Sequence, residues 1–327
     1  MSAAPPSLFV EAPARLHFGV LDLRGDLGRR FGGIGAAVPS PSLLLEARPS
    51  ATLRVEGPPA DVERALEAAR RFLSYHNLGG GAQVCLHRTI PAHAGLGSGT
   101  QLALAIARAL AEQHGLSTDA AALATAVGRG RRSAIGTWTF ALGGFVVEGG
   151  RRPDGAGVAP LLARLPMPGA WHCVILVPQG KPGLSGDEEA AAFARLAVPE
   201  AHAVEHVAHI VLMQLLPALA EANLAEFGAA LSEVQRITGR WFAEAQGGVF
   251  APGKSAELVE RLREWGATGV GQSSWGPAVY GLVADARTAE ILAERARGIV
   301  GPGGAVYAGP FSSEGARIGL GMPPEPR

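Results

Sequence analysis

The residues that point most directly to chemistry lie in the glycine-rich segment Gly95-Leu-Gly-Ser-Gly-Thr100. Its glycines let the backbone approach a ligand closely, and its serine and threonine hydroxyls add hydrogen-bond donors. Residues 82–90 before it alternate like a half-buried strand, and residues 101–110 after it are mostly Ala and Leu, as in a helix. A helix N-terminus presents free N–H groups and a positive dipole end to an anion, most often phosphate. We therefore predict a phosphate loop over residues 91–101.

The loop differs from two familiar nucleotide-binding loops. No Gly-Lys-Ser/Thr follows it, and its G-x-G-x-G spacing is not the dinucleotide fingerprint. Alone, it also fits a tight strand-to-helix turn capped by a serine. Two further segments, residues 128–137 and 269–277, combine glycine with hydroxyl or arginine side chains. Three such loops in one chain favour ligand binding over simple turns.

Bulk composition narrows the class of protein. The chain has 327 residues, 47% of them hydrophobic, and a formal net charge of zero, which argues against a nucleic-acid partner. Lys accounts for only two of the 29 basic residues, and the arginines suit phosphate or carboxylate binding. We see no signal peptide and no run of about 18 apolar residues, so we expect a cytoplasmic protein without a membrane span. Cys85 and Cys173 are expected to be buried thiols rather than a disulfide.

The surrounding elements alternate between strand and helix patterns. We expect two short strands within residues 8–21, broken at Pro13, and a strand over residues 140–148. Residues 151–168 are rich in Pro and Gly and predict a linker or a long hairpin. Strands and helices return afterwards, so the pattern favours an α+β chain of two layers. We place the domain boundary at residue 160, giving domains 1–160 and 161–327.

Three motifs together resemble those of the GHMP superfamily, which includes galactokinase, homoserine kinase and mevalonate kinase. They are Arg15-Leu-His-Phe-Gly, Pro91-x-x-x-Gly-Leu-Gly-Ser-Gly-Thr100 and the late Gly269-Val-Gly-x-Ser-Ser274, in this order. The resemblance covers almost the whole chain. It implies a two-layer fold with an N-terminal domain like ribosomal protein S5 and a ferredoxin-like C-terminal α/β domain.

One departure weakens a kinase interpretation. Many members carry a catalytic Asp in a Ser-Gly-x-x-Asp setting, where this chain has Ser133-Ala-Ile-Gly-Thr137. No acid lies between Asp119 and Glu148, so a carboxylate that takes a hydroxyl proton is missing there. Some family kinases work without that Asp, and an ATP-dependent small-molecule kinase stays the alternative. A phosphometabolite-binding protein without catalysis is a third interpretation.

A finer resemblance is to a non-kinase branch, the β-ribofuranosylaminobenzene 5′-phosphate synthases. It rests on the motifs above and on Gly28-Arg-x-x-Gly-Gly-Ile-Gly35, Gly128-Arg-Gly130, Gly143-Gly-Phe-Val-Val-x-Gly-Gly150 and Gln272-Ser-Ser-Trp-Gly-Pro-x-Val-Tyr280. Ala134 departs from the Gly usual in that branch. With the arginine bias, this resemblance favours a bacterial methylotroph as the source.

The resemblance implies a decarboxylating ribosyl transfer. Phosphoribosyl pyrophosphate condenses with 4-aminobenzoate or 4-hydroxybenzoate to a C-riboside, releasing carbon dioxide and pyrophosphate, as the first committed step towards tetrahydromethanopterin. It also implies bound Mg²⁺, no organic cofactor and a homodimer. Which benzoate is preferred stays open.

Candidate site residues follow from these motifs and from the chemistry. Arg15 or Arg29 can hold a carboxylate or phosphate, His17 and Asp22 can contact the para group or Mg²⁺, and the acids from Asp187 to Glu189 can hold Mg²⁺. The expected catalytic residues are Arg15, His17 and Asp22, with Asp187 and Glu188 as metal ligands. The expected substrate- and phosphate-binding residues are Gly95, Leu96, Gly97, Ser98, Gly99, Thr100, Arg29, Arg131, Ser133, Thr137, Gln272, Ser273, Ser274 and Trp275.

Each assignment has a structural alternative. His17 can be a hydrogen-bonded residue of a strand, and Trp275 can be core. Acids from Asp187 onward can simply favour a helix N-terminus. We expect His202, His206 and His209, spaced along one helix, to form a solvated or packed face rather than a zinc site.

Overall fold

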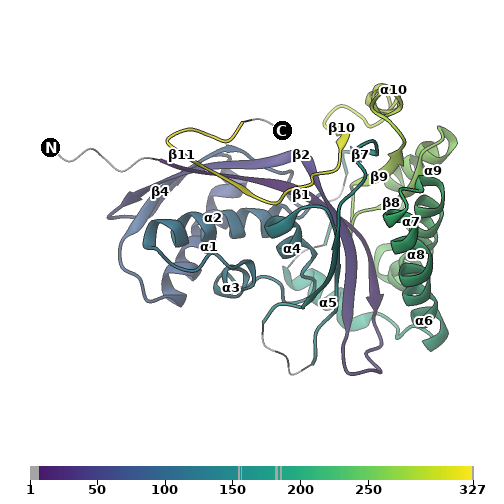
Figure 1. The fold of residues 1–327 in the computed structure, drawn as a ribbon, viewed down its shortest axis with the longest axis horizontal. Coiled ribbons are helices and arrows are strands. Elements are labelled where there is room, and N and C mark those ends of the chain that lie inside the picture. Colours follow the sequence, from purple (N-terminus) through teal and green to yellow (C-terminus); the bar gives the residue numbers. More distant parts are fainter. Residues whose placement is uncertain (1–6, 154, 156, 181–182, 185, 326–327) are drawn as a thin grey trace.

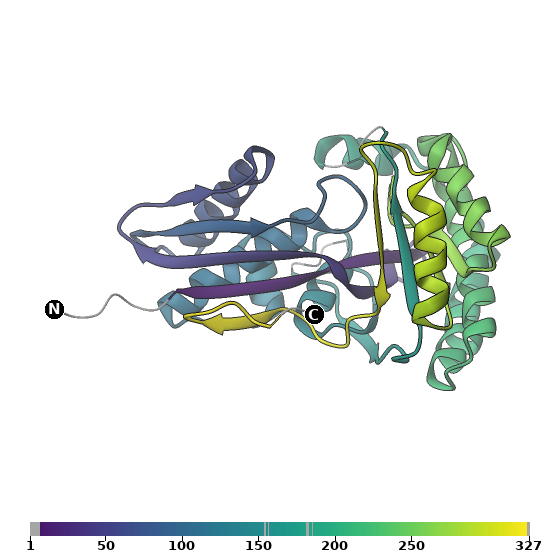
Figure 2. The same cartoon turned by 90° about the horizontal axis from the view of Figure 1, so that it is seen from above.

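Two antiparallel-rich sheets with separate helical layers make up the molecule (Figures 1 and 2). This computed structural model describes residues 7–153, 155, 157–180, 183–184 and 186–325. The first part contains β1 (Leu8–Asp22), β2 (Phe31–Ser50), β3 (Arg54–Glu56), α1 (Pro59–Tyr75), β4 (Gly81–Arg88), α2 (Ser98–His114), α3 (Ala120–Ala126), α4 (Ile135–Leu142), β5 (Phe145–Glu148) and β6 (Leu161–Leu165). The second contains β7 (His172–Val177), α5 (Gly186–Arg195), α6 (Ala201–Ile210), the π-helical turn η1 (Val211–Leu215), α7 (Leu216–Ala220), α8 (Leu224–Gln246), α9 (Lys254–Glu264), β8 (Thr268–Gln272), β9 (Val279–Val283), α10 (Ala286–Arg297), β10 (Ala305–Pro310) and β11 (Arg317–Leu320).

The first sheet is built on two long strands, β1 and β2. Its order is β11-β1-β2-β4-β3, and β5 and β6 extend it beside β2. β1 is continuous, so the expected break at Pro13 is wrong. The register with β2 shifts between Pro13 and Ala14 instead. A bulge accommodates the missing proline N–H, which leaves the strand long enough to carry Arg15 and His17.

Helices α1 to α4 cover one face of this sheet (Figure 1). The helix predicted after the phosphate loop is α2, and it is buried along most of its length because Ala and Leu face both the sheet and its neighbours. A strand over residues 140–148 is only partly correct. Residues 135–142 form α4, and the strand β5 starts at Phe145. Gly143 and Gly144, both with positive φ, separate the helix from the strand. The periodicity of a short apolar run cannot distinguish a buried helix from a buried strand, so the pattern alone did not predict this division.

The second sheet has the order β10-β7-β9-β8 and is antiparallel throughout. In chain order its elements follow a β-α-β-β-α-β pattern, with α5 to α9 before β8 and α10 before β10. This is the ferredoxin-like arrangement, so the predicted α+β fold class is confirmed. In Figure 2, α10 and the helices beyond it lie on the outer side of this sheet, away from the first sheet.

The two sheets do not divide at residue 160. β6 (Leu161–Leu165) pairs with β5, so residues 151–168 include the second arm of a long hairpin of the first sheet. β11 (Arg317–Leu320) returns to pair with β1. Both strands belong to the first sheet although they fall in the range expected for the second domain. Pairing at a sheet edge between residues so far apart in the chain leaves no local sequence signal, so the boundary at residue 160 did not anticipate it.

The continuous helical stretch Ala201–Ala220 is long and apolar enough to cross a membrane by length and composition. One such helix is weak evidence, since core helices of globular proteins pass the same test. Here its buried residues, Val207, Ile210 and Val211 among them, belong to the main core. His202, His206 and His209 are exposed, as expected for a solvated face. Cys85 and Cys173 are free thiols, half-buried and buried respectively.

Candidate active site

A cavity of about 550 Å³ lies where the two halves of the molecule meet. Its walls come from β1, the start of β2, the loop 128–133, helices α5 and α8, and the turn after β8. Five of its lining residues are arginines, two are acids, and five are aromatic. A site of this size with both charged and aromatic walls suits a small molecule that carries phosphate and a ring.

The predicted phosphate loop forms the N-terminus of α2. Gly97 is the N-cap residue, with φ of +79°, and the N–H groups of Thr100 and Gln101 turn back to its carbonyl oxygen. A Cβ on Gly95 would lie 2.1 Å from the Ser273 carbonyl oxygen, and one on Gly97 would lie 2.9 Å from Arg15 Cγ. Both positions therefore require glycine.

A hydrogen-bond network fixes this loop from two directions. Arg15 Nη1 and Ser273 Oγ both donate to the Gly95 carbonyl oxygen, at 2.5 and 2.6 Å. The His17 backbone N–H donates to Ser273 Oγ over 3.0 Å, and the Arg15 N–H donates to the Leu96 carbonyl oxygen over 3.1 Å. Strand β1, the phosphate loop and the late serine loop are thus one connected unit.

Three arginines that were not predicted for the site lie close to it: Arg64 and Arg129 at the start of α2, and Arg71 beside Gly128. A Cβ on Gly99 would lie 3.6 Å from Arg129 Nη2 and 3.7 Å from Arg64 Nη1, and one on Gly128 would lie 2.9 Å from Arg71 Nη1. Arg64 also donates to Ser98 Oγ over 3.4 Å. These guanidinium groups and the helix N-terminus are well arranged to bind phosphate.

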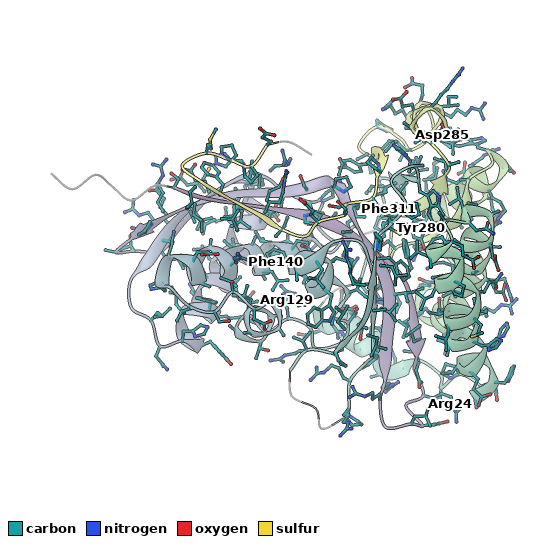
Figure 3. All side chains as sticks on the ribbon, in the orientation of Figure 1. Arg24, Arg129, Phe140, Tyr280, Asp285 and Phe311 are labelled. Atoms are coloured by element: carbon teal, nitrogen blue, oxygen red, sulfur yellow. The ribbon has the colours of Figure 1, made fainter. Side chains whose placement is uncertain are left out.

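Arg129 is the least satisfied of these arginines. Within the part of the chain that the structure describes, its guanidinium has no hydrogen bond and no ion pair, whereas Arg64 is paired with Asp61 and Arg71 with Glu67. Burial and the neighbouring charge of Arg71 lower the pKa of Arg129. Figure 3 shows Arg129 beside the helical layer of the first sheet. Arg129 lies in the Gly128-Arg-Gly130 motif, so its place in a glycine-rich segment was a sequence signal for this residue.

Aromatic rings form another wall of the cavity. Phe193 on α5 packs edge-on against Phe31, Phe242 and Trp275, with ring centroids 5.6 to 5.7 Å apart. Phe242 on α8 and Trp275 are themselves in edge-on contact at 5.1 Å. Edge-to-face packing of this kind is a preferred arrangement of aromatic pairs and orients each ring against its neighbours. Of these four rings only Trp275 was predicted from the sequence, since Phe31, Phe193 and Phe242 lie in separate elements without a common motif.

Glu189 connects this aromatic wall to the arginines. Its carboxylate accepts from Trp275 Nε1 over 3.1 Å and pairs with Arg132 Nη2 at 2.5 Å. The Arg132 guanidinium also lies 5.7 Å from the centre of the Phe193 ring. Glu189 is therefore engaged with protein groups, which leaves Asp187 as the other acid lining the cavity.

His17 lines the cavity although its side chain is only 8% exposed. Burial, and secondarily the positive charge of Arg15, lower its pKa to about 3, so the ring is neutral at physiological pH. Its Nε2 lies 3.3 Å from Ser133 Oγ. Burial likewise lowers the pKa of Arg15 to about 10.

The structure brings many of the expected site residues to one cavity. Those that line it are Arg15, His17, Thr100, Arg131, Ser133, Asp187, Gln272, Ser274 and Trp275. Behind this surface lie Gly95, Leu96, Gly97, Ser98, Gly99 and Ser273, which form or brace the phosphate loop.

Four expected residues lie elsewhere. Asp22 Oδ1 accepts from the Arg24 and Gly25 N–H groups at 2.6 and 2.8 Å, so its carboxylate closes the turn after β1. Arg29 Nη1 donates to the Gly150 carbonyl oxygen over 3.1 Å. Thr137 is fully buried because α4 turns it into the interior, and Glu188 is exposed. None of Asp22, Arg29, Thr137 and Glu188 is among the described residues that line the cavity.

The acids offer a limited metal site. Within the described residues there is no group of three or more His, Cys, Asp or Glu side chains that can hold a metal ion. Asp187 lines the cavity at the start of α5, and no described side chain pairs with it. Mg²⁺ is commonly held by one or two carboxylates together with substrate phosphates and water, so this donor set fits the ion only with a phosphate ligand present.

Sequence comparison places the chain among known proteins. Residues 62–144 match the GHMP kinases N terminal domain, and residues 215–300 match the GHMP kinases C terminal domain. The chain is 34% identical to the β-ribofuranosylphenol 5′-phosphate synthase of Methanothermobacter thermautotrophicus over 321 residues, covering 92% of this chain and 96% of that protein. It is 36% identical to the enzyme of the same name from Archaeoglobus fulgidus, covering 84% and 87%.

Solved structures support the fold. Homoserine kinase from Cytophaga hutchinsonii superposes with a TM-score of 0.64 at 18% identity, covering 95% of this chain and 97% of that one. Mevalonate diphosphate decarboxylase from Staphylococcus aureus gives a TM-score of 0.65 at 13% identity, covering 96% and 98%. At these identities the likeness concerns the fold alone.

Proposed function

The chain belongs to the β-ribofuranosylphenol 5′-phosphate synthase family of the GHMP superfamily, and we propose that it transfers ribose 5-phosphate to a 4-substituted benzoate with loss of carbon dioxide. The donor is phosphoribosyl pyrophosphate, and the other product is pyrophosphate. The observation that carries this proposal is that five arginines, Thr100 at the end of the phosphate loop, and an aromatic wall line one cavity.

The arginines and the loop suit the leaving group. When the bond between C1 and pyrophosphate breaks, negative charge grows on the pyrophosphate and positive charge on the sugar. The α2 N-terminus, the Thr100 hydroxyl and the guanidinium groups of Arg64 and Arg129 stabilise the departing charge. The N–H groups of the α2 N-terminus are fixed by the helix, and Arg64 is fixed by its ion pair with Asp61, so little reorganisation of these groups is needed during the reaction.

Mg²⁺ supplies further charge neutralisation when it is bound with the pyrophosphate. Asp187 is the protein ligand that fits this role, since it faces the cavity without a partner among the described side chains. Glu188, the other acid expected to bind the metal, is exposed outside the cavity lining, so we do not assign it.

The aromatic wall suits the acceptor ring. Phe193, Phe242 and Trp275 offer ring edges and faces to a flat benzoate, while Arg15 or Arg132 can hold its carboxylate. The curated relatives are named for a ribofuranosylphenol product. We therefore propose 4-hydroxybenzoate as the acceptor, with 4-aminobenzoate as the alternative.

The chemistry needs no organic cofactor. The para hydroxyl group pushes electrons into the ring, and the ring carbon that bears the carboxylate attacks C1. Loss of carbon dioxide returns its bonding electrons to the ring and restores aromaticity. His17, neutral and in the cavity wall, is the group that contacts the para hydroxyl. Asp22 is not assigned to this role, because its carboxylate closes a turn.

An ATP-dependent kinase is the alternative, because the structural relatives include kinases with the same phosphate-binding fold. The chain has no Asp or Glu between Asp119 and Glu148. Glu148 itself is fully buried and does not line the cavity, so it cannot take a proton directly from a bound alcohol. This arrangement disfavours the usual kinase base.

The product distinguishes these functions. Purified protein is incubated with phosphoribosyl pyrophosphate, Mg²⁺ and 4-hydroxybenzoate, and the product is analysed by mass spectrometry and NMR. A carbon–carbon bond between ribose C1 and the phenol ring supports the proposal. Phosphorylation of an alcohol by ATP, without the C-riboside, would support the kinase instead.

A further inference from the structure

The ion pair between Glu189 and Arg132 borders the cavity beside its aromatic wall. Both residues line the cavity, and their side chains are 23% and 35% exposed. Glu189 Oε2 lies 2.5 Å from Arg132 Nη2, and Glu189 Oε1 accepts from Trp275 Nε1 over 3.1 Å. The Arg132 guanidinium lies 5.7 Å from the centre of the Phe193 ring. A carboxylate, a guanidinium and aromatic rings therefore meet at one place in the cavity wall.

This contact resembles the one that a benzoate needs. A benzoate is a carboxylate on a flat ring, so it is bound by a guanidinium that pairs with the carboxylate and by aromatic side chains that contact the ring. In the free protein, the carboxylate of Glu189 pairs with the guanidinium of Arg132. Glu189 is thus an internal counterpart of the substrate carboxylate.

Arg132 is better placed for the acceptor carboxylate than other arginines of the cavity. Arg15 Nη1 donates to the Gly95 carbonyl oxygen, so its guanidinium braces the phosphate loop. Arg129 lies at the start of α2, where the leaving group is expected. Among the described arginines that line the cavity, Arg132 is the one whose guanidinium lies over an aromatic ring.

The ion pair uses only part of the binding capacity of Arg132. A guanidinium has five N–H donors in a planar fork, which matches the two oxygens of a carboxylate. Among the described residues, Glu189 is the one hydrogen-bond partner of this guanidinium, and it contacts Nη2 alone. A substrate carboxylate that takes two parallel N–H groups can therefore displace Glu189, which keeps its hydrogen bond from Trp275.

Helix α5, which carries Glu189, is not fixed by the hydrophobic cores. Among its described residues the single buried one is Ala192, which belongs to neither of the two clusters of buried hydrophobic side chains. The described side-chain hydrogen bonds and ring contacts of α5 come from Glu189 and Phe193. Opening the ion pair with Arg132 therefore disrupts no core packing.

We propose that Glu189 occupies Arg132 in the free protein and that the carboxylate of the acceptor displaces it. Arg132 is then the residue that selects an acceptor by its carboxylate, and Glu189 competes with the acceptor for it. After carbon dioxide leaves, the product has no carboxylate, so Arg132 returns to Glu189 and release of the C-riboside is favoured. The identity of the acceptor rests on the proposed function, whereas the exchange of carboxylates on Arg132 needs no turnover.

The test is a double-mutant cycle on benzoate binding by the full-length protein. Calorimetry measures the Kd of 4-hydroxybenzoate for the wild-type protein, Glu189→Gln, Arg132→Gln and the double variant, with pyrophosphate and Mg²⁺ present to fill the phosphate site. Glutamine keeps an oxygen for the Trp275 N–H but has no charge that competes for Arg132.

The two single variants should change affinity in opposite directions. We expect Glu189→Gln to lower the Kd about 2- to 5-fold, the value of a partly exposed ion pair. Arg132→Gln should raise the Kd about 10-fold, as for loss of a charged hydrogen bond. The gain from Glu189→Gln should disappear in the Arg132→Gln background, because the two residues act on the same contact.

Two controls accompany the cycle. 4-Hydroxybenzamide has the same ring without the charge, so its Kd should be the same for the wild-type protein and Glu189→Gln. Glu257→Gln removes a carboxylate from an exposed ion pair with Lys254, and it should leave benzoate binding unchanged. A higher Kd in Glu189→Gln, an equal gain in both backgrounds, or no benzoate binding to the wild-type protein would overturn the inference.

Turnover separates this inference from the proposed function. Glu189→Gln should lower KM for 4-hydroxybenzoate and lower kcat by up to the same factor, because loss of carbon dioxide no longer restores an ion pair. A coupled binding cycle without carbon dioxide release would support the carboxylate exchange and reject the proposed reaction. Carbon dioxide release with an uncoupled cycle would support the reaction and overturn the exchange.

Discussion

The Ser273 hydroxyl donates a 2.6 Å hydrogen bond to the carbonyl oxygen of Gly95, joining residues 178 positions apart. Ser273 follows the last residue of β8 in the second sheet, whereas Gly95 lies in the phosphate loop that follows β4 of the first sheet. The same serine oxygen accepts from the His17 N–H. One side chain thus holds the phosphate loop and the strand that carries His17 in a fixed relation.

The close approach of Gly95 to the Ser273 carbonyl oxygen predicts that a side chain at position 95 lowers the free energy of unfolding more than usual. Gly95 has φ of +80°, and an added Cβ would lie 2.1 Å from the Ser273 carbonyl oxygen. Gly115 also has positive φ, +62°, but nothing lies within 4 Å of its Cβ position. We expect Gly115→Ala to cost about 1 kcal/mol of unfolding free energy from backbone strain alone, and Gly95→Ala to cost several times more. Urea unfolding measures both. Equal losses would show that the contact with the serine loop is not rigid.

Arg129 should determine affinity for the leaving group. Arg129→Gln removes a guanidinium without a protein partner in the described structure, so we expect pyrophosphate binding to weaken about 10- to 100-fold, as for loss of a charged hydrogen bond. Arg129→Lys keeps the charge but loses the planar fork of the guanidinium group. Its affinity for pyrophosphate should lie between those of the wild-type protein and Arg129→Gln.

The matched control is Arg70→Gln on α1, whose guanidinium lies on the exposed side of the helix. Calorimetry with pyrophosphate and Mg²⁺ should show nearly unchanged affinity for this variant. If Arg70→Gln weakens pyrophosphate binding as much as Arg129→Gln does, the overall positive charge of the protein, and not the position of Arg129, accounts for the affinity.

Phe193 should affect the acceptor and not the donor. Its ring contacts Phe31, Phe242 and Trp275, so Phe193→Leu removes the centre of the aromatic wall. Aromatic contacts are worth about 0.5 to 1.5 kcal/mol, which predicts a rise of roughly 2- to 13-fold in KM for 4-hydroxybenzoate. KM for phosphoribosyl pyrophosphate should stay the same, as should both constants in the exposed control Tyr75→Leu. A change confined to the donor would place the acceptor elsewhere.

Glu148 should make the stability of the protein depend on pH. Burial raises the pKa of its carboxyl from 4.5 to about 7. A carboxyl group whose pKa is raised in the folded state contributes stability that is fully present below its pKa in the unfolded state. This stability is lost as pH rises through its pKa in the folded state. Relative to Glu148→Gln, the wild-type protein should therefore lose about 3 kcal/mol of unfolding free energy between about pH 4.5 and pH 8. Urea unfolding across this range measures the difference, and a difference that is constant with pH would contradict the buried, shifted carboxyl.

Motif chemistry predicted several of the residues that the structure brings to the cavity or to the loop behind it. The phosphate loop, Arg15, His17 and Trp275 occur in short glycine-rich segments whose residue types already limit their conformation. Thr137 belonged to such a segment by position, but α4 buries its side chain, which depends on packing against α2 and the sheet. Asp22 had a local signal of its own, since Asp before Arg and Gly commonly closes a turn.

The other residues of the cavity and the phosphate loop surroundings come together only through tertiary contacts. Arg64 reaches the start of α2 because α1 packs beside α2, and Arg71 on the same helix lies beside Gly128. Phe193 and Phe242 meet only because α5 and α8 come together. No spacing in the sequence predicts these encounters. The same holds for the first sheet, where β11 at the end of the chain pairs with β1 at its beginning.

The most direct test of the central claim is the release of labelled carbon dioxide. Carboxyl-labelled 4-hydroxybenzoate is incubated with the protein, Mg²⁺ and phosphoribosyl pyrophosphate, and pyrophosphate is measured in parallel, with 4-aminobenzoate as the second acceptor. We predict equal amounts of carbon dioxide and pyrophosphate, both absent when either substrate is omitted, with 4-hydroxybenzoate the faster acceptor. Pyrophosphate release without carbon dioxide, or no release from either benzoate, would contradict a decarboxylating ribosyl transfer.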